Sequence, residues 1–302
     1  MAEPVLVVGS IGLDTVETPC GRADGVLGGS AVYFAAAAAL FAPVRLVGVV
    51  GSDFPASARR RLESRPIDLS GLEEVQGGKT FRWHGRYSQD MNDRVTVSVE
   101  LNVLGEFRPR LPEAFKKTRW AFLANGPTST QQSVREQLPR GAFVAADTMD
   151  LWIEKERPGL LRLLRDIDCL ILNDSEARML TGRTSLWDAA REALRTGPKS
   201  VVVKKGEHGA YLAGRGGPCA VPAFPIAKLV DPTGAGDAFA GGFVGWLARE
   251  GSASPGALRR ALGAATVVAS FACESFGPER LLSARASEVR KRLSALRRLA
   301  RF

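Results

Sequence analysis

The most informative segment of the chain is Leu229-Val-Asp-Pro-Thr-Gly-Ala-Gly-Asp-Ala-Phe-Ala-Gly-Gly-Phe243. Its glycines predict a turn at 233–236 that lets the backbone approach a ligand closely. The small residues from Asp237 to Leu247 predict a helix that follows this turn directly. Backbone N–H groups at the start of such a helix bind anions, and the helix dipole adds partial positive charge. The stretch therefore predicts a phosphate site.

Asp237 adds a carboxylate to this anion site. A carboxylate repels phosphate unless a metal ion or positive groups compensate, so its presence suggests a base that takes a proton from an attacking hydroxyl. The alternative is that Asp237 only caps the helix. The stretch by itself leaves both roles open.

Short apolar runs around this stretch predict the rest of the architecture. They lie at 5–9, 45–51, 121–124, 142–146, 169–172 and 200–203, and helical segments such as 31–40, 131–138 and 159–165 separate them. Because the runs are continuous rather than alternating, we expect strands that are covered on both faces. The sequence predicts an α/β fold, a three-layer sandwich with a mostly parallel central sheet, formed by residues 1–302 as one domain.

One region has the alternating pattern of an antiparallel hairpin instead. Between Glu73 and Val103, two alternating runs flank the turn-like segment 89–93. We expect this insertion, approximately 73–103, to leave the main sheet as a small β lid that closes over the active site. A homodimer formed through the lid is one option for the assembly.

Cysteine and histidine counts exclude several classes of site. The four cysteines, at 20, 169, 219 and 273, have no paired spacing, which argues against a structural zinc site and a disulfide framework. Only two histidines are present, at 84 and 208, which excludes a histidine-rich metal centre. The apolar stretch 31–42 is too short to span a membrane, and the first residues lack the pattern of an export signal. We expect a cytoplasmic protein.

The basic charge is concentrated in one segment. Residues 280–302 contain eight basic residues and one acidic residue, so they carry +7 of the net +9. Val289, Leu293, Leu296 and Ala300 recur at helical spacing, which predicts a docked helix with a solvated basic face. An acidic partner or a membrane surface is the alternative, and a nucleic-acid partner is not expected.

Five segments together resemble the pfkB family of carbohydrate kinases, which have the ribokinase-like fold. In chain order they are Gly28-Gly29 before the alanine-rich helix, Val47-Gly-Val-Val-Gly-Ser-Asp53, Asn173-Asp-Ser-Glu176, Lys204-Lys-Gly-Glu-His-Gly-Ala210 and Asp231-Pro-Thr-Gly-Ala-Gly-Asp237. The last segment is highly specific, and the resemblance covers nearly the whole chain. It implies a kinase that uses ATP and Mg²⁺.

The resemblance also implies roles for particular residues. Asp237 is then the catalytic base, and the amides of Gly234, Ala235 and Gly236 hold the transferred phosphoryl group. Residues near the nucleotide are Lys205, Gly206 and Gly209, whereas Lys204 stands where the family often has a hydroxyl residue. The implied metal residues are Asn173 and Glu176, which order Mg²⁺ through water, and Asp231 and Thr233, whose backbone oxygens could hold K⁺. A helix cap is the alternative role for Asn173.

Acceptor contacts are where this chain departs from the family. The implied residues are Asp14, Gly28, Gly29, Tyr33 and, from the lid, Arg86. Gly12 and Tyr33 stand where the family typically has asparagines, so two polar sugar contacts are lost. That loss disfavours ribose and fructose 6-phosphate, because a site built to pair hydroxyls discriminates through those pairings. Tyr33 would suit a cyclitol or a nucleoside.

The function expected from the sequence is transfer of the γ-phosphate of ATP to a hydroxyl of a sugar, a sugar acid or an inositol. A nucleoside kinase is the first alternative. A non-catalytic protein of the same fold that binds a nucleotide or metabolite is the second. A dinucleotide oxidoreductase is a weaker option, because the segment Gly9-Ser-Ile-Gly-Leu-Asp14 lacks the full three-glycine spacing.

Overall fold

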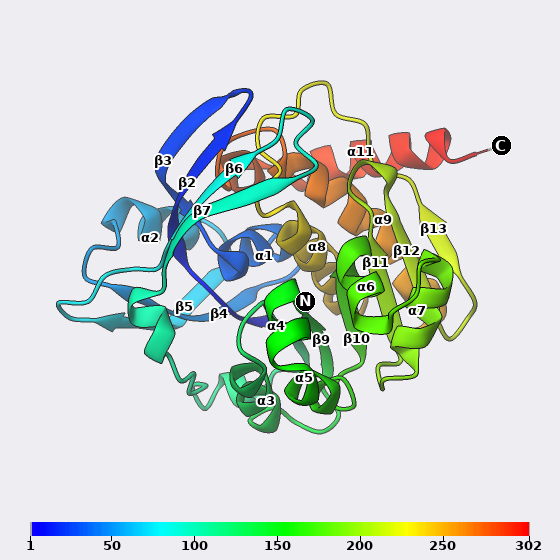
Figure 1. Ribbon diagram of the computed structural model, residues 1–302, viewed down its shortest axis with the longest axis horizontal. Coiled ribbons are helices and arrows are strands. Elements are labelled where there is room, and N and C mark those ends of the chain that lie inside the picture. Colours follow the sequence, from blue (N-terminus) through cyan, green and yellow to red (C-terminus); the bar gives the residue numbers. More distant parts are fainter. Residues whose placement is uncertain (1, 302) are drawn as a thin grey trace.

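The computed structural model describes residues 2–301, which form a central sheet between two layers of helices (Figure 1). Across the nine-stranded sheet the order is β13 (Cys219–Val221), β12 (Ala210–Gly214), β11 (Ser200–Lys204), β10 (Cys169–Asn173), β9 (Phe143–Asp147), β8 (Trp120–Leu123), β1 (Val5–Val8), β4 (Val44–Gly51) and β5 (Ile67–Val75). All neighbours are parallel except that β12 pairs antiparallel with both β11 and β13. The predicted fold class is confirmed.

Every apolar run named from the sequence is a strand of this sheet. The runs are buried along almost their whole length, for instance at β1 and β8. In register, Val5 lies between Val44 of β4 and Trp120 of β8. Such strands need helices on both faces, since either exposed face would leave a row of apolar side chains in water.

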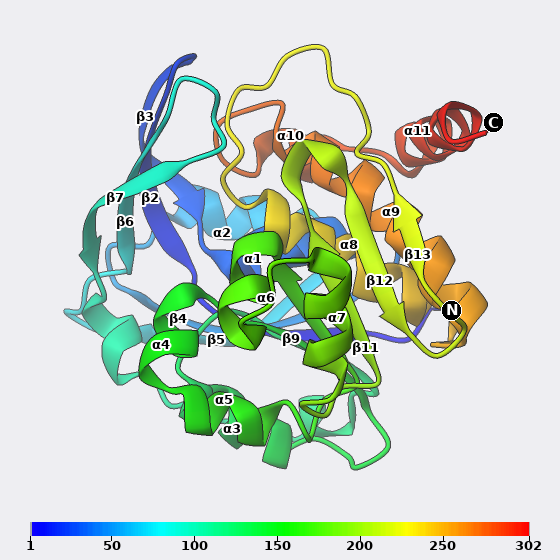
Figure 2. The same cartoon turned by 45° about the vertical axis from the view of Figure 1, so that its right-hand side comes forward.

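Two groups of helices supply that cover (Figures 1 and 2). One face carries α1 (Ser30–Ala38), α2 (Ala56–Glu63), α8 (Ala235–Glu250), α9 (Pro255–Ala272), α10 (Glu279–Ser283) and α11 (Ala286–Leu299). The other carries α3 (Thr128–Glu136), α4 (Asp150–Lys155), α5 (Arg157–Leu163), α6 (Asp174–Thr181) and α7 (Leu186–Leu194). Short 3₁₀ turns lie at η1 (Asn102–Glu106), η2 (Phe115–Lys117) and η3 (Gly206–His208).

Small residues allow α1 and α8 to pack closely. A methyl group at Gly241 of α8 would collide with the backbone carbonyl of Phe34 in α1, and one at Gly245 would lie 2.9 Å from the Cα of Ala38. The alanine run of α1 is the other half of this contact. Helix α8 is thereby held against α1, and its N-terminus is fixed relative to the sheet.

A second sheet forms the lid, in the order β3 (Gly21–Gly28), β2 (Gly12–Thr18), β6 (Arg82–Tyr87) and β7 (Arg94–Glu100). Strands β6 and β7 lie inside the segment expected to form the lid, whereas residues 73–75 belong to β5 of the main sheet. The β2–β3 hairpin was not foreseen. Strand β3 is mostly exposed and contains few apolar residues, so its sequence carries little strand signal.

Helix α11 docks as its spacing predicts. Val289, Leu293 and Leu296 are buried, while Arg290, Lys291, Arg297 and Arg298 are exposed, so the basic charge of this segment lies on a solvated face. Ala300, the fourth residue of the predicted apolar face, follows the helix and is exposed. Across residues 2–301, no helix has the length and apolar character needed to cross a membrane.

Candidate active site

Three polar residues end neighbouring strands of the main sheet. Asp147 ends β9, Asn173 ends β10 and Lys204 ends β11. In register, Lys204 is the direct neighbour of Asn173, and Asp147 pairs with Ile171, two residues before Asn173. Because these strands are parallel, their carboxyl ends meet at one edge, where open α/β sheets bind ligands.

The glycine turn faces the same edge and leads into α8. Gly234 is the N-cap residue of α8 and has φ 73°, and a methyl group there would collide with the ring of Tyr33. Two independent constraints therefore require glycine. The buried carboxylate of Asp231 accepts hydrogen bonds from the amides of Thr233, at 2.8 Å, and Gly277, at 3.4 Å. These bonds fix the turn.

Asp237 lies in the first turn of α8, as the third helical residue. The N-cap position itself is Gly234, which has no side chain to cap the helix, so Asp237 does not occupy the capping position considered from sequence. Burial raises the pKa of Asp237, and the positive charges of Lys204 and Arg94 act in the opposite direction. The carboxyl group of Asp237 thus lies at the glycine turn, where the two cations favour its charged form and burial disfavours it.

Asn173 and Glu176 form a capping box at the start of α6. Asn173 Oδ1 accepts from the Glu176 amide at 2.8 Å, and Glu176 Oε2 accepts from the Asn173 amide at 2.7 Å. The cap expected for Asn173 is thus present. Glu176 is only 8% exposed, and burial raises its pKa. Its other oxygen, Oε1, is left over for a metal-bound water.

Asp147 is a site residue that sequence reasoning did not select. Its Oδ1 and the neighbouring Thr148 Oγ1 are buried without a hydrogen-bond partner. Burial first, and then the charges of Asp237 and Glu176, raise the pKa of Asp147 well above its usual value. One signal was available: Asp147 directly follows the apolar run 142–146, at the end of a predicted strand.

These oxygens fit a hydrated Mg²⁺ ion. Magnesium keeps several of its waters and takes one or two carboxylates from the protein. Glu176 and Asp147 offer carboxylate oxygens, and the orphaned Asp147 Oδ1 needs a partner that water or a metal would supply. Residues 2–301 contain no cluster of three acidic, histidine or cysteine ligands, so a dry, fully protein-bound metal does not fit.

Asp14 forms the buried end of the expected acceptor site. It is 4% exposed, its Oδ1 has no partner, and its carboxylate fills the space that a side chain at Gly28 would need. Burial raises its pKa to about 7, with the Gly29 amide acting against this rise. Gly28 and Gly29 therefore lie beside Asp14, and their role in binding the acceptor stays a prediction.

Two other expected acceptor residues have partners within the protein. Tyr33 is 2% exposed and its ring packs beneath Gly234, which accounts for the tyrosine without a ligand. Arg86 lies on the lid, where its Nε donates to Glu17 Oε2 at 2.7 Å. Arg86 and His84 together lower the pKa of Glu17 to about 2. Acceptor contacts by Tyr33 and Arg86 stay predictions.

Phe81 packs beside Gly12, one of the two positions where the family typically has an asparagine. A methyl group at Gly12 would lie 2.8 Å from a ring carbon of Phe81 and 3.1 Å from Asp14 Oδ1. Phe81 precedes β6 and is partly exposed. An aromatic ring therefore stands next to the buried carboxylate, where the family typically has an asparagine.

The expected nucleotide loop follows β11 directly. It contains Lys205, Gly206 and Gly209 around the turn η3, and the Lys205 amide donates to the Gly209 carbonyl at 2.8 Å. Gly209 has φ 95°, and a side chain there would collide with the backbone of Val221. The loop begins at the same edge of the sheet as Asn173, which is consistent with contact to a bound nucleotide.

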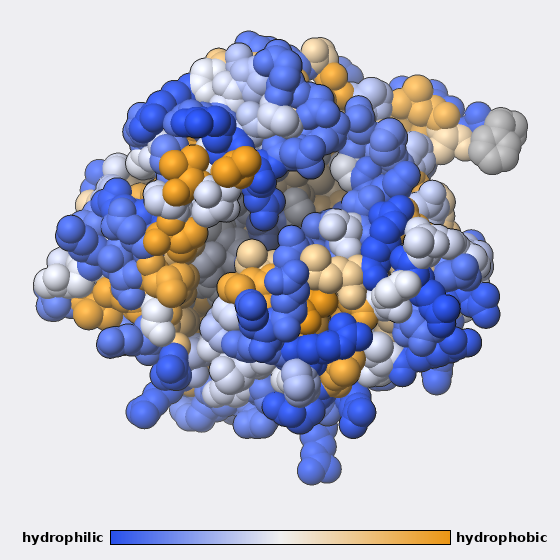
Figure 3. Space-filling view, in the orientation of Figure 1, coloured by the Kyte–Doolittle hydropathy of each residue, from blue (hydrophilic) through white to orange (hydrophobic). Residues whose placement is uncertain are grey.

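The lid reaches the glycine turn. Thr233 Oγ1 and the Tyr87 hydroxyl, at the end of β6, form a hydrogen bond of 3.1 Å. Arg94, the first residue of β7, also acts from the lid, because its charge lowers the pKa of Asp237 and Glu176. Figure 3 shows the surface hollowed between the lid and the helices α4 and α6.

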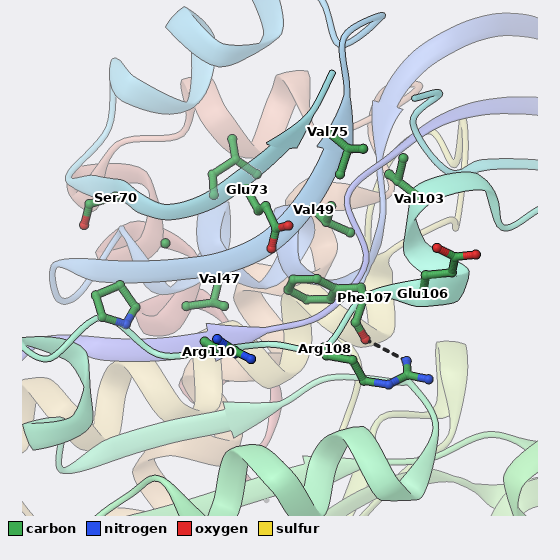
Figure 4. Close-up of a pocket in the computed structure, with 13 residues that line it drawn as sticks. Val47, Val49, Ser70, Glu73, Val75, Val103, Glu106, Phe107, Arg108 and Arg110 are labelled. Atoms are coloured by element: carbon green, nitrogen blue, oxygen red, sulfur yellow. Dashed lines mark hydrogen bonds between the residues drawn. The ribbon is translucent and has the colours of Figure 1, made fainter. Parts of the chain in front are cut away.

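A separate groove lies along strands β4 and β5. It has a volume of about 550 Å³ and is lined by these two strands and the segment 103–112 (Figure 4). Val47, Val49 and Phe107 form its floor, and Glu73 and Arg108 are among its charged residues. None of the catalytic or binding residues expected from the sequence lines it, so we place the chemistry at the strand ends.

Comparison with known proteins shows the family to which this chain belongs. The model of the pfkB family of carbohydrate kinases matches residues 20–285. A cytidine kinase of Thermococcus kodakarensis is 34% identical over 254 residues, which cover 81% of this chain and 88% of that protein. The chain therefore belongs to the pfkB family of carbohydrate kinases, and it is a phosphotransferase that acts on a hydroxyl group.

Solved structures share the fold at low sequence identity. The nucleoside kinase of Burkholderia thailandensis in complex with inosine superposes with a TM-score of 0.79 at 20% identity, covering 97% of this chain and 98% of that chain. A ribokinase II structure from Escherichia coli with ATP and Mg²⁺ also gives 0.79 at 20% identity, covering 97% and 99%. Kinases of this family use ATP and Mg²⁺.

Proposed function

We propose that the protein transfers the γ-phosphate of ATP to a hydroxyl of a small polyol, with Asp237 as the catalytic base. The observation that carries this proposal is the placement of Asp237 in the first turn of α8, at the glycine turn 234–236 and near Lys204. An intact base at an anion site serves phosphoryl transfer. A protein that only bound the nucleotide would not need it.

The residues divide the reaction between them. Asp237 takes the proton of the acceptor hydroxyl as its oxygen bonds to the γ-phosphorus, and the bond from that phosphorus to ADP breaks. The amides of Gly234, Ala235 and Gly236 stabilise charge on the transferred group. Glu176, Asn173 and Asp147 would hold hydrated Mg²⁺, which neutralises charge on the β- and γ-phosphates when bound.

A nucleoside is the acceptor class that the site favours. Asp14 offers a buried carboxylate to a pair of ribose hydroxyls, and Phe81 offers an aromatic face beside it. A flat base attached to a ribose matches this combination of one polar and one aromatic surface. The similarity to a cytidine kinase supports the same class. Sugars, sugar acids and inositols, which the sequence placed first, are the competing acceptors.

Two finer expectations complete the proposal. K⁺ would bind backbone oxygens near Asp231 and Thr233, since both Asp231 carboxylate oxygens already accept amide hydrogen bonds. A second copy of the chain would pack on the lid, where β7 is an edge strand with exposed Val95, Val97 and Val99. Orange side chains along the lid in Figure 3 mark this apolar band.

Replacing Asp237 tests the proposal directly. Asp237→Asn keeps the shape and removes the base, so kcat should fall by a factor on the order of 10³ or more while the affinity for ATP stays within a few-fold. ADP release is measured with nucleosides, sugars, sugar acids and inositols, each with and without Mg²⁺. Asp93→Asn, an exposed position in the lid turn, serves as the control.

The outcomes separate the alternatives. Turnover with cytidine or another nucleoside supports the proposed acceptor, and turnover only with a sugar or an inositol assigns the competing class. If the wild-type protein bound ATP but transferred phosphate to none of these, the non-catalytic alternative would replace the proposal. An Asp237→Asn variant with near-normal kcat would refute the base.

A further inference from the structure

Lys204 has a side chain that the family resemblance does not explain. It is the last residue of β11 and stands next to Asn173 in the register of the sheet. A methyl group at position 236 would lie 2.8 Å from its Nζ. The ammonium group is therefore in contact range of the glycine turn whose amides form the proposed phosphate site.

This ammonium group has no partner of its own. Within residues 2–301, the Lys204 side chain takes part in no ion pair or hydrogen bond with the protein. Its charge nonetheless reaches three acids around the site and lowers the pKa of each, namely Asp237, Asp147 and Glu176. A half-buried cation close to several carboxylates, yet paired with none, is free to bind an anion that enters between them.

We propose that Lys204 contacts the γ-phosphoryl group of ATP during transfer, a role that rests on the proposed kinase function and adds a residue to it. The amine approaches from the carboxyl end of β11, and the charge of Arg94, from the lid, acts on Asp237 and Glu176. The proton of the acceptor hydroxyl goes to Asp237, and the electron pair of the broken phosphorus–oxygen bond leaves with ADP.

The physical reason is the charge of the transferred group. In the transition state, negative charge spreads over the three oxygens of the γ-phosphoryl group, and fixed positive groups next to them lower the barrier. The amides at 234–236 carry only partial charge. A lysine held beside Gly236 supplies a full positive charge without reorganisation, whereas a hydroxyl residue at this position would not.

A purely structural role makes a different prediction. If Lys204 only balanced the charge of Asp147, Glu176 and Asp237, its loss would change stability and weaken all nucleotides alike. A phosphoryl contact is specific for the third phosphate. The comparison of ADP with the non-hydrolysable analogue AMP-PNP therefore separates the two roles, and it needs no acceptor.

The test uses Lys204→Met, which keeps the length of the side chain and removes its charge. We expect affinity for Mg²⁺·AMP-PNP, measured by calorimetry, to fall at least tenfold while affinity for Mg²⁺·ADP changes less than threefold. With an active acceptor, kcat should fall at least 100-fold and the acceptor KM should change little. Lys199→Met is the matched control, since Lys199 flanks the opposite end of β11 and pairs with Asp168 at the surface.

Each outcome has one meaning. Equal weakening of ADP and AMP-PNP, or a kcat within threefold of the wild type, would overturn the role of Lys204. If Lys204→Met does not fold, Lys204→Gln is measured in the same way, because it keeps polarity and lacks charge. Failure of the kinase proposal looks different: the wild type then transfers no phosphate to any acceptor, whatever the nucleotide affinities of the variants.

Discussion

Asp14 is a buried carboxylate whose protonation should control the stability of the protein. Burial raises its pKa from 3.8 to about 7 in the folded chain. The folded state therefore holds a proton that the unfolded chain releases. The contribution of Asp14 to the free energy of unfolding is largest below pH 4 and is lost as the pH rises through 7.

The variant Asp14→Asn removes this dependence. Relative to the wild type, it should become more stable as the pH rises from 4 to 8, by an amount on the order of 4 kcal/mol. Urea unfolding of both proteins at several pH values measures the difference. A difference between Asp14→Asn and the wild type that does not change with pH would mean that the Asp14 carboxylate is solvated.

At the level of single residues, the sequence indicated those candidate site residues that belong to one local motif. The glycine turn and Asp237 lie in one local pattern, and Asn173 and Glu176, three residues apart, were selected through the resemblance to the pfkB family. Asp147, Lys204 and Arg94 come from three distant segments, and only the parallel register and the folded lid bring their charges together. No spacing in the sequence predicts that these three charges lie close together.

Helix α11 is anchored by one inward-facing charge among its many exposed ones. The guanidinium of Arg292 lies 3.8 Å from the ring centroid of Phe271 and 5.1 Å from that of Phe224. It also pairs with Glu274 at 2.6 Å and donates to Ser270 Oγ at 2.6 Å. Three kinds of contact thus hold the helix on α9.

Arg292→Ala should lower the free energy of unfolding by about 2–3 kcal/mol, because it removes a cation between two rings and leaves a partly buried carboxylate with one fewer partner. Chemical denaturation measures the loss. Arg290→Ala, an exposed position on the same helix, should change stability by less than about 0.5 kcal/mol. Equal effects of the two changes would show that α11 is held by its apolar face alone.

At the level of elements, burial determined which strands could be predicted from the sequence. The six apolar runs were found because both faces of those strands are covered. The hairpin of β2 and β3 was missed because an exposed strand needs no apolar pattern. In addition, β2 pairs with β6, which lies more than 60 residues away in the chain. Strands β12 and β13 are likewise short, with five and three residues, so they form no long apolar run.

The whole molecule presents one long apolar edge, on β7 of the lid. Val95 is 68% exposed, and Leu101, just after the strand, is 55% exposed. An unpaired edge with apolar side chains favours association, and a second copy supplies an identical edge in the opposite direction. This is the structural basis for the proposed homodimer.

Val97→Glu places a charge at the centre of that edge. We expect it to convert a dimer into a monomer in light scattering coupled to gel filtration, because two buried carboxylates would face each other. Leu299→Glu, another exposed apolar position, on α11, should leave the dimer intact. A wild-type protein that is monomeric at micromolar concentration, or a Val97→Glu variant that stays dimeric, would contradict the lid interface.

The lid is made from two separate parts of the chain, and its strands therefore leave the ribosome at different times. Strands β2 and β3 emerge early, but β6 and β7 must follow before the second sheet can close. Thr18 then donates to the carbonyl of Val230 at 2.9 Å, a contact across 212 residues. A nascent chain can therefore complete the lid sheet well before the lid has the glycine turn to rest on. The strands of the lid are therefore synthesised before Asp237, the proposed catalytic base.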